Sequence, residues 1–262
     1  IIVSADYDSD DVLFNAVKDS LQVNNPLPAT GGNSGDTIED IRLNSVANFG
    51  AQNRTVTRED YIIRVLSMPS KFGKIAKAYI TNDEQIDAGN GERILNPNAL
   101  NLYTLGYDQN KNFINLNPAT RQNVIAYLEE HRLLTDAINI KDAFIINFKL
   151  EFDIVTFKNF SNNQVLLNCI NALKRYFNPD VWQINQPIIL SEVYNVIGAV
   201  SGVQNVNRVH LNNVSGESLG YSKYSYDFNS ALINNVLYPS MDPSIFELKN
   251  PDQDITGRIV NY

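Results

Sequence analysis

The chain has 262 residues, of which 44% are hydrophobic and 10% aromatic, enough to fill one large or two to three small cores. Its formal net charge of −8 argues against a nucleic-acid partner, because nucleic-acid binding depends on neutralisation of phosphates by Lys and Arg. No apolar run reaches membrane-spanning length, so no membrane partner is predicted, and the single cysteine, Cys169, excludes an intrachain disulfide and favours folding in a reducing cytoplasm.

The first 25 residues are predicted to form a short strand, Ile1 to Val3, and a helix that begins after the acidic run Asp6 to Asp11. Aspartates alternate in this run as they do at the start of a calcium-binding loop. Asp11, however, stands where such a loop needs glycine, and Val17 stands where it needs a bidentate glutamate. The acids are better explained by the positive end of the following helix, and no metal site is predicted. Because the chain opens at Ile1 without a leader-like segment, we expect a fragment of a longer protein.

A glycine-rich turn and a first capped helix are predicted next. The turn, Gly31 to Gly35, is not followed by the GK[ST] of a phosphate-binding loop, so its glycines indicate a tight connection and no phosphate site. Asp36 and Glu39 form the pattern of a capping box, which starts a helix near Thr37. The apolar positions of this helix form a wide band, consisting of Ile38, Ile41, Leu43, Val46, Ala47 and Phe49.

A second capped helix is predicted to begin after Thr57, with Glu59 and Asp60 in its first turn, where the helix dipole favours negative charge. Four apolar residues are predicted to form its buried face: Tyr61, Ile62, Val65 and Leu66. Pro69 ends it. We interpret the two helices as an assembly element, not as an active site.

Two paired strands are predicted in the middle of the chain. Lys74 to Thr81 alternates Ala76, Ala78 and Ile80 with more polar residues that include Lys77, which is typical of a half-buried strand. A polar loop covers residues 82–93, and Leu100 to Tyr107 is predicted to be the partner strand, buried on both faces.

A helix is predicted to start at Asn117 and Pro118, a favourable cap and first residue. Its predicted apolar face consists of Val124, Tyr127, Leu128, His131 and Leu134, whereas Glu129 and Glu130 face solvent. His131 is interpreted as a core histidine, because no second histidine, cysteine or carboxylate pair stands at metal-ligand spacing from it.

Residues 141–215 are predicted to form an α+β module. Ile146 to Ile154 alternates strictly between apolar and polar residues, which indicates an antiparallel sheet whose polar face is either solvated or reserved for a partner. A helix opened by Ser161 follows, with an apolar stripe of Leu166, Ile170, Leu173 and Phe177. After a short strand around Pro187 to Leu190 come a helix bearing Val193, Ile197 and Val200 and, beyond Gly202, a strand from Val203 to Leu211, in which His210 is exposed. The order strand, helix, strand, helix, strand suggests a module of the split βαβ kind.

From Gly216 onward helical periodicity is lost and tyrosines, asparagines and prolines accumulate. Short strands are predicted at Ile245 to Leu248 and at Ile259 to Val260. An extended aromatic segment gains stability by lying on another surface, either its own domain or a neighbouring chain. Five aromatic residues are candidates for an interface with another chain: Tyr221, Tyr224, Tyr226, Tyr238 and Phe246.

Several fragments occur in the order found in one known family. They are ATGG (Ala29 to Gly32) before an acidic helix start, RTVTREDY (Arg54 to Tyr61), the strand and helix from Phe144 to Phe177, INQPI (Ile184 to Ile188) and SGVQNV (Ser201 to Val206). The set resembles the baseplate J-like family, in particular its wedge subunits from T4-like contractile-tailed phages, over roughly Leu27 to the C-terminus. The resemblance implies a structural role in the virion tail baseplate, assembled in the host cytoplasm, in which subunits form a dimer and then a ring and bind other baseplate wedge proteins.

The predicted fold class is α+β. Residues 1–140 form a helical pair with a small antiparallel sheet and a covering helix, residues 141–215 form the α+β module, and residues 216–262 form an extended C-terminal arm. No catalytic residue, cofactor site or metal site is predicted. Two alternatives from other functional classes remain open: a tail-associated polysaccharide hydrolase that uses two carboxylates, and a carbohydrate-binding module that uses exposed tyrosines.

Overall fold

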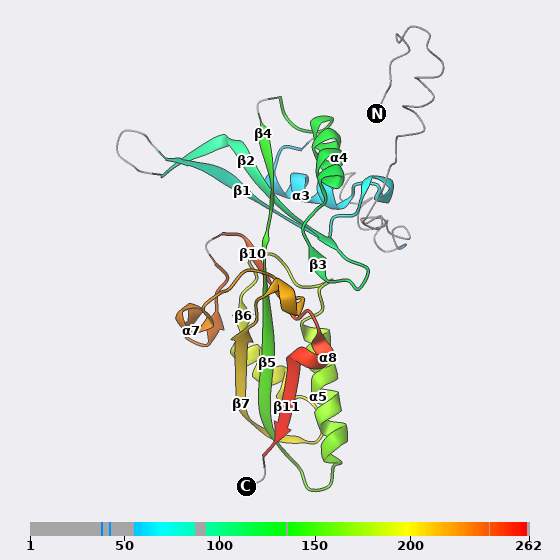
Figure 1. The fold of residues 1–262 in the computed structure, drawn as a ribbon, viewed down its shortest axis with the longest axis vertical. Coiled ribbons are helices and arrows are strands. Elements are labelled where there is room, and N and C mark those ends of the chain that lie inside the picture. Colours follow the sequence, from blue (N-terminus) through cyan, green and yellow to red (C-terminus); the bar gives the residue numbers. More distant parts are fainter. Residues whose placement is uncertain are drawn as a thin grey trace, which may run out of the picture. The chain divides into compact units, whose positions relative to one another are not determined.

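The computed structural model describes residues 55–86, 93–134, 136–240 and 242–260, together with Ile38 and Arg42 (Figure 1). The chain divides into two compact units, residues 1–30 and residues 31–262. The first strand and helix, the glycine-rich turn and the Asp36 capping box lie outside the described residues. Ile38 and Arg42 are helical, but Ile38, predicted for an apolar band, is 87% exposed.

The second capped helix is confirmed as α3 (Arg58–Leu66). The Thr57 hydroxyl accepts a hydrogen bond from the Asp60 N–H (3.2 Å), and the Asp60 carboxylate accepts one from the Thr57 N–H (2.9 Å), which completes a capping box. Tyr61 and Val65 are buried as predicted, but Leu66 is exposed, because it lies in the last turn beyond the surface that α3 covers. A short 3₁₀ turn, η1 (Ser70–Phe72), follows.

The first sheet is built around the long strand β2 (Arg93–Tyr107). It pairs antiparallel with β1 (Lys77–Ile86) and with β3 (Phe113–Ile114), and parallel with β4 (Ala137–Asp142). The predicted β1–β2 pairing is therefore confirmed, but both strands extend into residues predicted as a loop. β4 was not predicted from the sequence, and Lys77, assigned to the solvated face of its strand, is buried.

The helix begun by Asn117 is confirmed as α4 (Pro118–Glu129), whose Thr120 N–H donates to Asn117 Oδ1 (2.6 Å). Val124 and Leu128 are fully buried, and Glu129 and Glu130 are exposed. The predicted apolar face is too long, because α4 ends before His131 and leaves Leu134 exposed.

The central sheet is built on β5 (Phe144–Thr156), the strand with the strictest alternation. β7 (Val203–Asn213) pairs with it antiparallel, whereas β10 (Ser244–Glu247) and β11 (Ile255–Ile259) pair with it in parallel. The predicted purely antiparallel sheet is thus wrong, and the sheet is mixed. Asn147, predicted for the solvated face, is fully buried.

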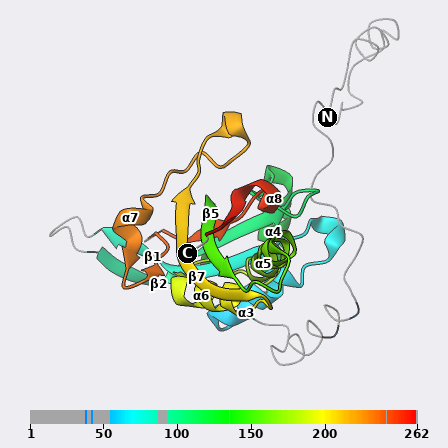
Figure 2. The same ribbon diagram turned by 90° about the horizontal axis from the view of Figure 1, so that it is seen from below.

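One face of the central sheet is covered by α5 (Asn162–Tyr176) and α6 (Leu190–Gly198), which lie side by side (Figure 2). Both helices were predicted. Of the predicted stripe of α5, Leu173 and Phe177 are buried, whereas Leu166 and Ile170 are only half-buried and the neighbouring Val165 and Cys169 take the buried positions. Burial raises the pKa of the Cys169 thiol to about 11. The exposed position of His210 is confirmed. β6 (Ile188–Ile189) joins a separate sheet, which distinguishes this module from a split βαβ unit.

The segment after Gly216 contains η2 (Glu217–Leu219), α7 (Phe228–Ala231), β8 (Leu232–Ile233), β9 (Val236–Leu237), β10, α8 (Pro251–Asp254) and β11. β8, β9 and β6 form a three-stranded sheet in the order β6-β9-β8. The two predicted late strands correspond to β10 and to β11, which starts four residues earlier than predicted. Because both pair with β5, this part of the segment completes the central sheet of its own chain.

Two hydrophobic clusters stabilise the described part of the chain, and β2 contributes to both. Leu100 and Leu102 pack with α3, α4 and β1, whereas Leu105 packs into the larger cluster around β5. This confirms that β2 is buried on both faces. None of the helices in the described ranges is long and apolar enough to cross a membrane.

Candidate interaction surface

The candidate surface is the small sheet β6-β9-β8, which is built on a tight hairpin. Asn234 and Asn235 both have positive φ (51° and 62°), the backbone of a two-residue type I′ turn, and asparagine tolerates this conformation better than most residues. The turn pairs Leu232 with Leu237 and Ile233 with Val236. The register therefore fixes which side chains share each face.

The inner face of this sheet is apolar and is buried at β6 and β9, whereas Leu232 of the edge strand β8 is 41% exposed. Leu237 and its partner Ile188 are 1% and 0% exposed, and Leu232 lies beside them over a small hollow of about 50 Å³ that Phe228 also lines. This face anchors the hairpin on the larger hydrophobic cluster.

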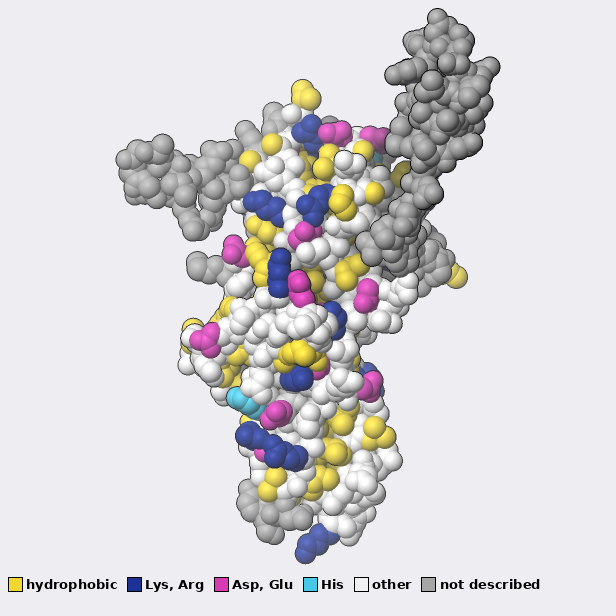
Figure 3. All heavy atoms as spheres, viewed as in Figure 1, with side chains coloured by type: hydrophobic (Ala, Val, Ile, Leu, Met, Phe, Trp, Pro, Cys, Tyr) yellow, Lys and Arg dark blue, Asp and Glu magenta, His cyan; other side chains and the backbone are white. Residues whose placement is uncertain are grey.

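The outer face carries apolar side chains that the chain does not cover. Ile233 is 55% exposed and Tyr238 is 49% exposed, with Val236 and Ile189 half-buried beside them. Tyr238 extends the hairpin, since its N–H donates to the Ala231 carbonyl (3.3 Å). Figure 3 shows hydrophobic side chains at the surface on the side where Figure 1 places α7. β8 is also an edge strand without a charged residue, and exposed edges of this kind favour pairing with another chain.

The five predicted interface residues are not equally available to a partner. Phe246 is 3% exposed in the core, and Tyr221 is 8% exposed, with its hydroxyl donating to Asp254 Oδ1 (2.6 Å). Tyr224 packs edge-on against Phe144, and Tyr226 donates its hydroxyl to the Tyr238 carbonyl (2.9 Å). Of the five, Tyr238 has the most exposed position, and its interface role stays a prediction.

Ile233, the most exposed apolar residue of the hairpin, was not among the interface residues predicted from the sequence. A signal for it was present: Leu-Ile, Asn-Asn and Val-Leu follow one another at residues 232–237. Two apolar pairs separated by two asparagines are typical of a type I′ hairpin. That pattern predicts two very short strands, one of which is left at an edge.

A buried carboxyl group joins the first sheet to the central sheet. Glu247 of β10 is 3% exposed and accepts hydrogen bonds from the Phe113 N–H (2.6 Å) and from Asn147 Nδ2 (2.7 Å). Burial raises its pKa to about 7, although both hydrogen bonds and Lys249 act in the opposite direction. Glu247 is too enclosed to reach a substrate, so its geometry fits a structural role.

A buried ammonium group lies at the same junction. Lys77 is 5% exposed, and its Nζ donates to the Asp180 carbonyl (2.8 Å). Burial lowers the pKa of Lys77 to about 8, and the nearby Asp180 carboxylate limits the shift. The Tyr107 hydroxyl donates to the neighbouring Pro179 carbonyl (3.2 Å). These bonds attach β1 and β2 to the loop that follows α5.

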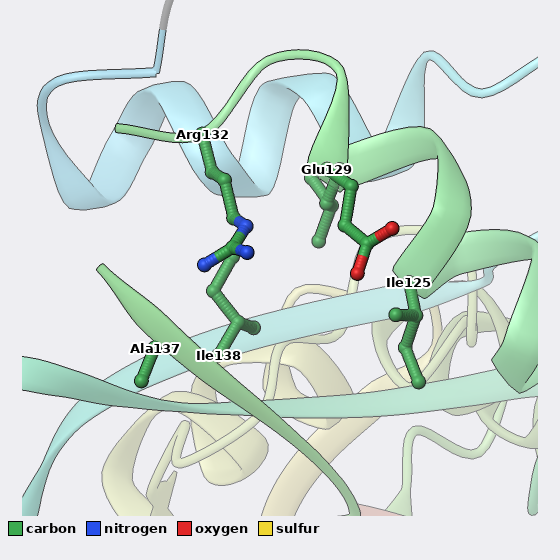
Figure 4. Close-up of a pocket in the computed structure, with 6 residues that line it drawn as sticks. Ile125, Glu129, Arg132, Ala137 and Ile138 are labelled. Carbon is green, nitrogen blue, oxygen red and sulfur yellow. The ribbon is translucent and has the colours of Figure 1, made fainter. Parts of the chain in front are cut away.

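A hollow of about 250 Å³ lies between α4 and β4 (Figure 4). Ile125, Glu129 and Arg132 line it from the α4 side, and Ala137 and Ile138 line it from β4. Among the described residues that line it, Glu129 is the only one with a carboxylate, whereas a glycoside hydrolase uses a pair. Nearby, the His131 ring packs edge-on against Tyr127, with ring centroids 5.0 Å apart, and its carbonyl accepts from the Thr55 N–H (3.0 Å). Within the described ranges, no group of three or more His, Cys, Asp or Glu residues is placed to hold a metal ion.

Comparison with known proteins gives matches among solved structures, but none among family models or curated sequences. Among solved structures, a cryo-EM structure of the anti-feeding prophage baseplate, symmetrised six-fold, is similar to the chain with a TM-score of 0.44 and 12% sequence identity. The match covers 90% of this chain and 44% of that one, so the chain spans less than half the length of its structural neighbour. A likeness at this level carries no argument about function.

Proposed function

We propose that the chain is a structural, non-catalytic subunit of a contractile phage tail baseplate wedge. It associates with copies of itself, as a dimer and then a ring, and binds other wedge proteins, in a virion tail assembled in the host cytoplasm. Nucleic acid and membranes are not among its partners. The observation that carries the proposal is the ordered set of fragments that resembles the baseplate J-like family.

The places that these fragments occupy in the fold support a structural role. In RTVTREDY, Thr57 forms the capping box of α3. In INQPI, Asn185 has a positive φ of 61° and exchanges two hydrogen bonds with Ser244 at the start of β10. In SGVQNV, Gly202 has a φ of +99°, and a Cβ atom there would lie 2.6 Å from Val165 Cγ2. All three residues shape junctions between elements, so the fragments that carry the resemblance have structural roles in the fold.

The outer face of the hairpin supports self-association. Ile233 and Tyr238 offer exposed apolar surface next to an uncharged strand edge, and residues 228–241 contain no Asp, Glu, Lys or Arg. For a chain with a net charge of −8, an uncharged surface is where two copies meet with least repulsion. We assign this face to a contact between two copies of the chain.

Sedimentation velocity from about 1 μM to about 100 μM tests this assignment, a range that detects micromolar dissociation constants. We expect association in the wild type and weaker association in an Ile233→Asp, Tyr238→Ser double variant. Leu219→Asp is the matched control, because Leu219 is 70% exposed outside the hairpin. A wild-type chain that stays monomeric throughout would contradict self-association. A chain truncated after Asn213 cannot be used to test self-association, because the truncation removes β10 and β11 from the central sheet.

A hydrolase assay tests the non-catalytic part of the proposal. We expect no soluble sugar when the chain is incubated with peptidoglycan or lipopolysaccharide. Release of sugar by the wild type that disappears after substitution of one carboxylate would contradict a purely structural role and favour the hydrolase alternative.

A further inference from the structure

The β2–β3 hairpin, residues 106–114, is a small unit at the end of the first sheet. Its strand β3 pairs with the last two residues of β2. The turn between the two strands is held by contacts of its own, because Asp108 Oδ1 accepts hydrogen bonds from the N–H groups of Asn110 (2.7 Å) and Asn112 (2.8 Å). The β2–β3 hairpin can therefore move as a unit.

The contact with Glu247 attaches this hairpin to the central sheet at its most enclosed point. Besides the Tyr107 hydroxyl contact described above, Lys111 Nζ donates to Asp180 Oδ2 (3.0 Å). The side chains of this ion pair are 70% and 46% exposed, and a pair as exposed as this contributes little. The hydrogen bond from the Phe113 N–H to Glu247 Oε1 (2.6 Å) is buried instead. Glu247 is therefore the contact on which the attachment depends most.

An open hollow of about 360 Å³ lies beside this buried contact. Asn112, which precedes Phe113, lines the hollow from the β2–β3 hairpin. Leu248 and Lys249, which follow Glu247, line it from the end of β10. The solvent-accessible space therefore starts one residue away from the Phe113–Glu247 hydrogen bond on both sides. A small outward movement of the β2–β3 hairpin is enough to connect the carboxyl group with this space.

The groups around Glu247 disfavour its ionised form while the β2–β3 hairpin is in place. Burial, the largest cause, raises the pKa of Glu247 to about 7, and repulsion by the Asp108 carboxylate of the hairpin acts in the same direction. Lys249 and the two uncharged donors on β3 and β5 act in the opposite direction. Tyr107 also lies nearby, but burial raises the pKa of its hydroxyl, which is therefore neutral between pH 5 and pH 8. Hydration of the carboxylate and its separation from Asp108 both favour an open hairpin.

We propose that the β2–β3 hairpin is a proton-controlled latch between the first sheet and the central sheet, closed while Glu247 is protonated and opened by its ionisation. Opening moves the Phe113 N–H away from Glu247 and admits water to the carboxylate from the hollow, where Lys111 and Lys249 offset its charge. Phe113 is 2% exposed in the closed form, and its packing opposes the movement, so the open form stays the minor one.

The latch gives the open form a defined dependence on pH. Glu247 has a pKa of about 7 in the closed form, and its pKa is near the ordinary 4.5 once the carboxylate is hydrated. Between these values each pH unit favours the open form by up to about tenfold, and above pH 7 the effect levels off. The opening constant therefore rises about 70-fold from pH 5 to pH 8. This change takes place within one chain, so the latch goes beyond the proposed function and does not depend on association.

Hydrogen exchange of the Phe113 amide, followed by NMR at pH 5, 6, 7 and 8 and corrected for the intrinsic exchange rate, measures the opening constant. Low concentrations of urea separate the latch from global unfolding. Exchange through local opening exposes little surface and hardly changes with urea, whereas exchange through global unfolding rises with it. The amides of Leu150 to Ile154, in the part of β5 that is paired on both sides, report global unfolding.

In the wild type we expect the Phe113 amide to exchange faster than the β5 amides and independently of low urea, with an opening constant that rises about 70-fold from pH 5 to pH 8. In Glu247→Gln the opening constant should be the same at all four pH values, because the amide does not titrate. Glu129→Gln is the matched control, since it removes the same charge from an exposed position of α4, and it should keep the wild-type rise.

Three outcomes overturn the inference. If the Phe113 amide exchanges with the rate and the urea dependence of the β5 amides at every pH, the β2–β3 hairpin opens only when the chain unfolds. If its local opening is the same at pH 5 and pH 8, the latch is not controlled by a proton. If the opening constant still rises with pH in Glu247→Gln, another group controls it. The first two outcomes are decided by the wild type alone, so the test does not depend on the folding of a variant.

Discussion

The buried carboxyl group of Glu247 predicts a specific dependence of stability on pH. Its pKa is about 7 in the folded chain, against an ordinary value of 4.5. Between these two values the folded chain holds a proton that the unfolded chain has released. The unfolding free energy therefore falls as pH rises through this window, and the fall from below pH 4.5 to above pH 7 amounts to about 3 kcal/mol.

A Glu247→Gln variant should remove this contribution. Glutamine has the shape of the neutral carboxyl group, and its Oε1 can still accept from the Phe113 N–H or from Asn147 Nδ2. The glutamine NH₂ group then faces the other of these two donors, and this unpaired contact lowers the unfolding free energy by about 1–3 kcal/mol at every pH. We therefore expect the variant to have a lower unfolding free energy than the wild type at acidic pH, and an equal or higher one at pH 8, where the wild type has lost its own contribution of about 3 kcal/mol.

Urea unfolding of both proteins at pH 5, 6, 7 and 8 measures the effect. The comparison is between the two pH profiles, so groups common to both proteins cancel. Lys77 does not interfere, because its folded pKa of about 8 lies below the ordinary 10.5 and changes stability mainly above pH 8. If the difference between the two proteins is the same at pH 5 and pH 8, the argument about Glu247 is refuted.

Two further predictions concern packing and capping. Gly257→Ala should lower the unfolding free energy by about 1–3 kcal/mol, because its Cβ would lie 2.4 Å from Phe152 Cζ and 2.5 Å from Leu166 Cδ1. The matched control, Gly198→Ala, meets nothing within 4 Å and should stabilise α6 by up to about 1 kcal/mol; thermal melting that ranks the two variants in the opposite order would contradict this. Thr57→Ala should cost about 0.5–2 kcal/mol by opening the capping box of α3, whereas Thr57→Ser should restore most of it, and an unchanged melting temperature in the alanine variant would show that the cap does not stabilise the helix.

Local patterns in the sequence predicted the elements whose physics is local. Thr57 and Asn117 each supply a side-chain oxygen three residues before the N–H that it caps, so the starts of α3 and α4 could be located. Strict alternation located β5. The C-terminal ends of the helices were harder to predict, because Leu66 is exposed in the last turn of α3 and Leu134 is exposed beyond the end of α4.

The partners of β5 could not be predicted because they lie far away in the sequence. Phe144 pairs with Ser244 and Leu150 pairs with Ile255, and no local pattern encodes such pairing. The same limit applies to β4, which is only six residues long and pairs in parallel with β2, a strand more than 30 residues earlier in the chain. Lys77 was placed on a wet face because a lone lysine in an alternating strand is normally solvated.

The candidate surface was only partly predictable. Aromatic content identified Tyr238, but it also identified Phe246 and Tyr221, which the fold uses internally. Composition alone cannot distinguish an aromatic residue that packs in the core of its own chain from one that is exposed and free to contact another chain. The distinction depends on the parallel pairing of β10 and β11 with β5, which is a property of the whole fold.

The position of β5 between strands from distant parts of the chain has a consequence for synthesis on the ribosome. The ribosome makes β5 about 100 residues before it makes β10 and β11, the two strands that pair with β5 in parallel. The pairing of Phe144 with Ser244 is an example of this separation. At about 5–20 residues per second, that interval lasts about 5–20 s. During it, the apolar side chains of β5 lack their final neighbours, and the nascent chain offers a strand edge to other polypeptides. Folding of the central sheet is therefore a late step. Strong overexpression, which raises the concentration of unfinished chains, should increase the aggregated fraction of the protein more than the soluble fraction.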